Sequence, residues 1–89
     1  MPAFLARVYV SLKPTVNDPQ GLTIADGLRS LGFGEVAGVR AGKYIEVRLG
    51  AASADEARGR VDAMCDKLLA NPIIETYRFE VEETISTTG

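Results

Sequence analysis

The stretch Ser53–Tyr77 reads SADEARGRVDAMCDKLLANPIIETY and decides the fold, because it contains a helix with clear end signals and leads into a strand. Ser53 is a favoured N-cap residue and Glu56 follows three positions later, which is the spacing of a capping box. Asn71 can take the left-handed conformation that often ends a helix, and Pro72 cannot continue one. The sequence therefore predicts a helix between Ser53 and Asn71.

Apolar residues recur along this helix at the spacing of a single helical face, and polar residues fill the other side. Because the chain has one cysteine and no histidine, Cys65 can neither form an internal disulfide nor be activated by an imidazole. Cys65 is therefore predicted to be a small core residue. The predicted buried face consists of Ala54, Ala57, Val61, Met64, Cys65, Leu68 and Leu69.

Residues 4–12 alternate between two kinds of side chain, which predicts a strand. The even positions are all apolar and are expected to face the helices. The odd positions carry Leu5 and Tyr9 among polar side chains, so that face is too apolar to meet only water. Leu5 and Tyr9 are therefore candidates for self-association, which suits a chain that buries only about 60–65% of its unfolded surface.

A second helix is predicted to begin at Asp18 and Pro19, which read as an N-cap and a first helical residue. Gly32 supplies the stop signal. Gly27, inside this helix, is expected to permit a close approach, more often within the fold than by a partner. The apolar residues of this helix are Leu22, Ile24, Ala25, Leu28 and Leu31.

Two further strands complete the pattern. Residues 33–40 look extended and residues 44–49 alternate, so the two segments form either a hairpin or one long bent strand. The residue pattern over 73–81 predicts the last strand. The order of the predicted strands and helices indicates an α+β fold with two helices on one face of a mainly antiparallel sheet. The arrangement is either ferredoxin-like βαββαβ or a variant with a long bent central strand. We expect one domain over residues 1–83 and a frayed polar tail over 84–89.

Composition narrows the functional classes. The net charge of −2, without a basic cluster, gives no basis for nucleic-acid binding. The sequence shows no membrane-spanning run and no signal peptide, so a cytoplasmic protein is expected. Without histidine or a phosphate-binding glycine motif, we expect no metal site, no cofactor and no catalytic residues in the chain.

Two polar clusters stand out as contact candidates. One is the turn Arg40–Tyr44, with two cations and an aromatic ring, and the other is Lys13 together with Asp18–Gly21 at a helix start. Backbone amides at such a start can receive an anion. The charge of Asp18 opposes an anion there, so a structural or protein-contact role is favoured.

Three separated motifs resemble the PurS subunit of phosphoribosylformylglycinamidine synthase, in the right order and at the right spacing from about Phe4 to Glu83. The first is VYVSLKP at Val8–Pro14 followed by DPQG at Asp18–Gly21. The second is VRAGKYIE at Val39–Glu46, and the third is MCDKLLANPIIE at Met64–Glu75.

This resemblance implies a ligase complex of purine biosynthesis, in which formylglycinamide ribonucleotide becomes an amidine. The implied partners are a glutaminase subunit, PurQ, and a large synthetase subunit, PurL, which use the glutamine, ATP and Mg. The small subunit is not catalytic; it assembles the other two, supports ammonia transfer and forms a homodimer or homotetramer.

Carried onto this chain, the resemblance makes eight residues candidates for contacting partners or shaping contact loops. The main alternative is a dimeric ferredoxin-like regulatory domain that binds a small metabolite between subunits. The eight candidates are Lys13, Asp18, Pro19, Arg40, Lys43, Tyr44, Asn71 and Pro72.

Overall fold

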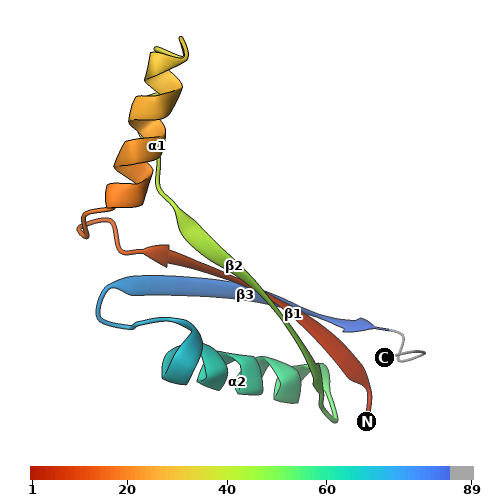
Figure 1. Cartoon of the computed structure of the whole chain (residues 1–89). Coiled ribbons are helices and arrows are strands. Elements are labelled where there is room, and N and C mark those ends of the chain that lie inside the picture. The colour runs from red at the N-terminus through yellow and green to blue at the C-terminus, as the bar shows by residue number, and fades with distance from the viewer. Residues whose placement is uncertain (85–89) are drawn as a thin grey trace.

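The computed structural model describes residues 1–84, which form a three-stranded antiparallel sheet and two main helices (Figure 1). The sheet has the order β2-β1-β3, so β1 is the central strand. The predicted α+β class is confirmed. The elements are β1 (Ala3–Leu12), α1 (Pro19–Ser30), β2 (Gly42–Gly50), α2 (Ala54–Met64), the π-helical turn η1 (Cys65–Leu69) and β3 (Glu75–Thr84).

The register of the sheet places the apolar positions of all three strands on one side, which we call the inner face. Val8 of β1 lies opposite Ile45 of β2 and Phe79 of β3. The even positions of β1 from 4 to 10 are buried, as their alternation predicts, and Leu12 at the end of the strand is half-buried. These buried residues are Phe4, Ala6, Val8 and Val10.

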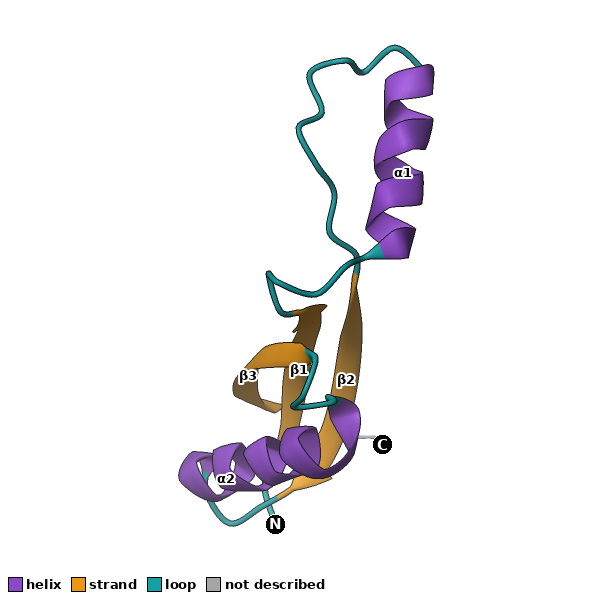
Figure 2. Cartoon of the chain, turned by 90° about the vertical axis from the view of Figure 1, so that its left-hand side faces the viewer, coloured by secondary structure: helices purple, strands orange, loops and turns teal. Residues whose placement is uncertain are grey.

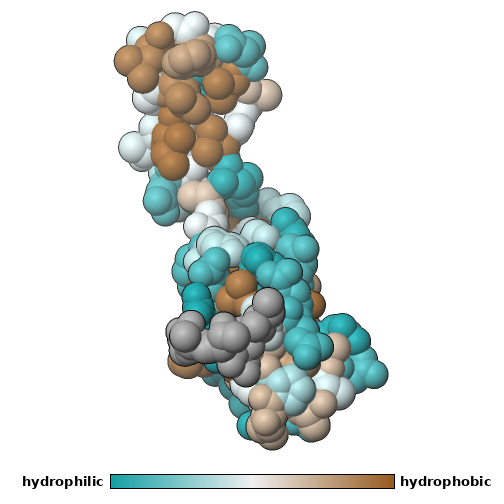
Figure 3. All heavy atoms as spheres, turned by 90° about the vertical axis from the view of Figure 1, so that its right-hand side faces the viewer, coloured by the Kyte–Doolittle hydropathy of each residue, from teal (hydrophilic) through white to brown (hydrophobic). Residues whose placement is uncertain are grey.

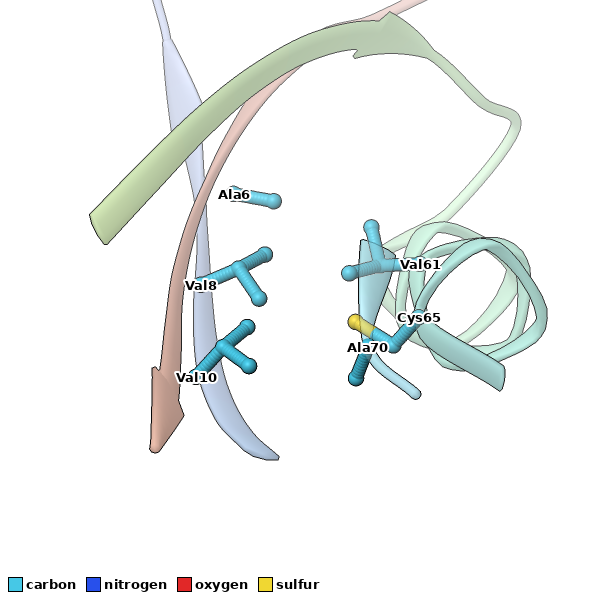
Figure 4. Close-up of a cluster of buried hydrophobic side chains, with 6 residues drawn as sticks. All are labelled: Ala6, Val8, Val10, Val61, Cys65 and Ala70. Atoms are coloured by element: carbon cyan, nitrogen blue, oxygen red, sulfur yellow. The ribbon is translucent and has the colours of Figure 1, made fainter. Parts of the chain in front are cut away.

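Helix α2 covers part of the inner face and closes the core. Val61 of α2 and Cys65, the first residue of η1, point toward Val8 and Val10 (Figure 4), and all four side chains are buried. The predicted core position of Cys65 is confirmed, and burial raises the pKa of its thiol. The N-cap is confirmed as well, because the Glu56 N–H donates to Ser53 Oγ at 3.1 Å, whereas the Glu56 carboxylate accepts from the Ala52 N–H at 3.3 Å and not from Ser53.

The end of α2 differs from the predicted helix at Leu68. The Ala70 N–H donates to the Cys65 carbonyl at 3.0 Å, five residues back, which widens the last turn by one residue. The wider turn brings Leu69 and Ala70 toward the core and turns Leu68 outward, where it is 83% exposed. The prediction that Leu68 belongs to the buried face is wrong for this reason.

Helix α1 begins and ends as predicted, with Asp18 as N-cap and Gly32 in a left-handed conformation (φ 104°). Its position differs from the expected layer, because α1 projects beyond the end of the sheet (Figures 1 and 2). Within the described residues, α1 has no substantial packing contact with a strand. The molecule is therefore elongated, with a radius of gyration of 17.0 Å against about 12 Å for a compact chain of this length.

Residues 33–41 form no strand, so the expected hairpin or long bent strand is wrong. This segment, which we call the strap, runs beside α1 and then enters β2 (Figure 2). Two of its carbonyl groups are bonded by Arg29 instead of by a neighbouring strand. Thr84, the first residue of the predicted tail, ends β3, and 85–89 lie outside the described residues.

Candidate functional site

The eight contact candidates lie close to the end of the sheet from which α1 projects. The Lys13 N–H donates to the Ile74 carbonyl at 2.8 Å, which joins the end of β1 to the start of β3. Lys43 Nζ lies 3.6 Å from Glu75 Oε2, and this ion pair joins the start of β2 to the start of β3. The three motifs, distant in sequence, therefore meet at this end.

Asp18 ties both ends of the α1 segment to each other. Its Oδ1 accepts from the Gly21 N–H at 3.0 Å, and its Oδ2 accepts from the Ala41 N–H at 2.7 Å. Asp18 as a residue is only 5% exposed. The bonds from Gly21 and Ala41 lower the pKa of Asp18, so the group stays ionised and acts as a double cap. Pro19 occupies the first helical turn as predicted.

Arg40 makes a second tie across the same connection. Its Nη2 donates to the carbonyl of Lys13 at 2.9 Å and to that of Val16 at 3.0 Å. Both chain crossings between sheet and α1 are therefore fastened by side chains. We call the two ties made by Asp18 and Arg40 the pivot, and α1 together with the strap the arm.

Arg29 completes the arm and was missed by the sequence reading. Its Nε and Nη2 donate to the carbonyls of Val36 and Ala37 at 3.1 and 3.3 Å, which fixes the strap against α1. Basic residues are common in the last turn of a helix, so the sequence position of Arg29 did not indicate these bonds to the strap. A pocket of about 280 Å³ lies between α1 and the strap, and Asp18, Arg29 and Arg40 are among its lining residues.

The outer face of the sheet carries Leu5 and Tyr9 of β1, which are the two self-association candidates, and the ring of Tyr44 of β2. Tyr9 packs against Tyr44 with 5.2 Å between ring centroids, and the Arg78 guanidinium lies 4.0 Å from the Tyr9 centroid. The Tyr9 hydroxyl donates to Glu80 at 3.0 Å, which raises the pKa of Tyr9. Leu5 and Tyr9 are half-buried among these interacting side chains. Their role in self-association stays a prediction.

The turn between η1 and β3 holds the last two candidates, Asn71 and Pro72. Asn71 is not left-handed, since no residue other than glycine has a positive φ within the described chain. The prediction of a left-handed Asn71 is therefore wrong, because a following proline favours the extended region. Its Oδ1 instead accepts from the Ile73 N–H at 3.0 Å. The exposed apolar residues nearby are Leu68, Ile73 and Ile74.

Glycine would replace a left-handed residue without loss, but the observed bond to Asn71 Oδ1 predicts a different result for Asn71→Gly. Glycine removes the acceptor of the Ile73 N–H, so we expect a loss of stability of about 0.5–1.5 kcal/mol in chemical denaturation. Asn71→Ser keeps a side-chain oxygen at this position and is expected to lose less. Equal stability of Asn71→Gly and the parent chain would show that the side-chain bond contributes nothing.

The surroundings of these residues indicate contact surfaces. Among residues 1–84, no group of three or more histidine, cysteine, aspartate or glutamate side chains could hold a metal ion. No helix in the same range is long and apolar enough to cross a membrane. Most candidate side chains bond one segment of the chain to another, while the apolar side chains near them are exposed on the surface. The structure thus defines a small α+β protein organised around a projecting arm and exposed apolar surfaces.

Comparison with known proteins gives the family. The PurS family model, for phosphoribosylformylglycinamidine (FGAM) synthase, matches residues 5–83. The PurS subunit of Synechocystis sp. is 47% identical over 89% of this chain and 79% of its own length. That of Bacillus subtilis is 46% identical over 93% of this chain and 98% of its own. A chain in the structure of PurLQS from Thermotoga maritima has a TM-score of 0.82 and 36% identity, and the match covers 94% of this chain and 100% of that one.

This chain belongs to the PurS family, the small subunit of phosphoribosylformylglycinamidine synthase, a ligase of purine biosynthesis. Membership of this family explains the presence of the three motifs, which meet at the end of the sheet from which α1 projects.

Proposed function

We propose that this chain is the non-catalytic subunit that joins the glutaminase subunit PurQ to the large synthetase subunit PurL and supports ammonia transfer between them. The observation that carries the proposal is the likeness of the whole fold to a chain of the PurLQS structure from Thermotoga maritima. In this account the partners use glutamine, ATP and Mg, and this chain binds no cofactor. It acts in the cytoplasm as a homodimer or homotetramer, without contact to nucleic acid or membrane.

The turn at Asn71 and Pro72 is the surface we assign to the larger subunits. Ile73, next to it, is 79% exposed, and Leu68 on the preceding turn is 83% exposed. Apolar side chains on a rigid turn are suited to fill a partner's pocket, because burying them releases water without ordering the loop. The Asn71 side chain and the Lys13–Ile74 bond hold this turn in place.

Co-elution of the three subunits tests this proposal. Purified PurL and PurQ are mixed with or without this chain, in the presence of glutamine, ATP and Mg²⁺, and separated by size. We expect one complex that contains all three only when the chain is present. Equal association of PurL and PurQ without the chain would contradict the joining role.

Two variants locate the contact within the same experiment. Ile73→Asp is expected to remove the chain from the complex while leaving its fold intact by circular dichroism, because it places a charge at an exposed apolar contact. Asp55→Ala is the matched control, since Asp55 is exposed at the far end of α2 and should leave co-elution unchanged. Normal co-elution of Ile73→Asp would exclude this turn as the contact.

A further inference from the structure

The pocket between α1 and the strap shares no residue with the turn that we assign to the larger subunits. Its volume is about 280 Å³. A cavity of roughly 150 Å³ is enough to bind benzene, whereas sites for drug-sized molecules begin at about 300 Å³. The pocket therefore has room for a small molecule with a body the size of one ring and a single head group.

The walls of this pocket are fixed at both ends. Arg29 bonds two carbonyls of the strap near the end of α1, and Asp18 accepts from the Ala41 N–H near its start. Between these ties, a Cβ on Gly38 would meet nothing within 4 Å, so the strap leaves open space there. A ligand that enters the pocket does not have to order these segments, which favours binding.

The charged residues of the lining carry a net positive charge, because Arg29 and Arg40 face one carboxylate, that of Asp18. Both oxygens of Asp18 already accept backbone N–H groups. Arg40 uses only Nη2 in the pivot, and its Nε and Nη1 have no partner among residues 1–84. Arg29 Nη1 lies 3.5 Å from the exposed carboxylate of Asp26, which is a weak pairing. Donors on two cations are thus available to an anion, and such charge-assisted bonds are stronger than neutral ones.

Apolar side chains form another part of the lining. Leu22 and Ala25 of α1 and Val39 of the strap border the pocket, and Ala25 is only 2% exposed. Hydrophobic residues also gather over the surface of the arm (Figure 3). An apolar body in the pocket would displace water from these side chains, which an inorganic ion cannot do as well.

We propose that this pocket binds a small monocarboxylate with a compact apolar body, whose carboxylate accepts from Arg40 and Arg29 and whose body packs on Leu22. One negative charge balances the excess positive charge of the lining. A phosphate monoester carries about two negative charges near pH 7, so it would be repelled more strongly by Asp18. The ligand bridges α1 and the strap and therefore stiffens the arm. This site is independent of the joining role, because it is tested on the isolated chain without PurL or PurQ.

Three probes with the same ring and different head groups test the site. The isotope-labelled chain is titrated at pH 7 with benzoate, phenyl phosphate or benzyl alcohol and followed by the NMR shifts of its amides. Benzoate is expected to shift amides of α1 and the strap in a saturable manner. It should bind at least about tenfold more tightly than benzyl alcohol and more tightly than phenyl phosphate. Absence of shifts in the arm, equal binding of benzyl alcohol, or equal or tighter binding of phenyl phosphate would each overturn the proposal.

Two variants assign the binding to the pocket. Arg40→Gln is expected to weaken benzoate binding at least about tenfold, whereas Arg48→Gln, on β2 outside the arm, should not change it. Leu22→Ala keeps both ties of the pivot and a good helix former, so its effect cannot come from a released arm. We expect a loss of about threefold or more for Leu22→Ala and none for Leu31→Ala, which lies outside the pocket. Affinity like that of the parent chain in Arg40→Gln or Leu22→Ala would overturn the site.

Amide hydrogen exchange gives a second readout of the bridging. A ligand that binds only the closed arm lowers the population of the open arm by the factor 1 + [L]/Kd. At a benzoate concentration ten times its Kd, exchange in α1 should therefore slow about tenfold, while exchange in β1 should not change. An exchange rate in α1 that does not respond to benzoate would overturn the bridging.

Discussion

Val61→Ala is expected to lower the free energy of unfolding by about 2 kcal/mol, because it removes two buried methyl groups between α2 and the sheet. The Val61 side chain is fully buried against Val8 and Val10, so the loss leaves a cavity that the strands cannot fill without losing their register. A change of this size corresponds to a lower Tm by roughly 8–16 °C in a domain of this length. Chemical denaturation at fixed protein concentration measures it.

Leu68→Ala is the matched control and separates two accounts of the same helix. A regular α-helix places Leu68 on the buried face with Val61, so truncating it should cost about as much. The π-helical turn places Leu68 outside, so the loss should stay within about 0.5 kcal/mol. Equal losses for the two variants would show that the helix continues regularly to its end.

Asp18→Ala is expected to release the arm while leaving the core folded. The substitution removes the N-cap of α1 and the acceptor of the Ala41 N–H together. Amide hydrogen exchange in α1 should therefore accelerate by at least about tenfold, while the amides of β1 stay protected. Asp26→Ala is the control, because the Asp26 carboxylate is exposed and only pairs loosely with Arg29. Unchanged exchange in α1 would contradict the double cap.

The same carboxylate predicts a dependence on pH. The backbone donors hold the folded-state pKa of Asp18 below the unfolded value of about 3.9. The stabilisation is thus complete above the unfolded value and is lost as the pH falls through the lower folded pKa. Protection of α1 in the parent chain should fall in that acid range. Asp18→Asn cannot ionise, so its α1 protection should lack this acid step.

Local sequence patterns were sufficient for β1, β2 and β3 and for the helix starts, but not for the strap. Alternation along β1 gave its buried residues correctly, because the side-chain period of a strand depends only on neighbouring residues. The caps at Asp18 and Ser53 were predicted for the same reason, since each bonds an amide three residues away. Gly32 was likewise identified from its place just after the helix.

The remaining features depend on contacts that no local pattern contains. One extra residue in the turn after Cys65 changes which side chain is buried, and helical periodicity does not show such a turn. The strap looked extended from Val36 and Val39, yet an arginine side chain bonds its carbonyls. The place of α1 depends on the bond from Ala41 to Asp18, 23 residues apart. The eight contact candidates could be named from the sequence, and their role in contacts stays a prediction, but their gathering at one end of the sheet could not be predicted.

The central claim, that this chain joins the glutaminase to the synthetase, is tested most directly by the ammonia source that the enzyme can use. PurL and PurQ are assayed for amidine formation with glutamine or with free ammonia, each with and without this chain. Omitting the chain is expected to abolish the glutamine-driven reaction and to preserve the ammonia-driven one. A glutamine-driven rate that is unchanged without the chain would contradict the account.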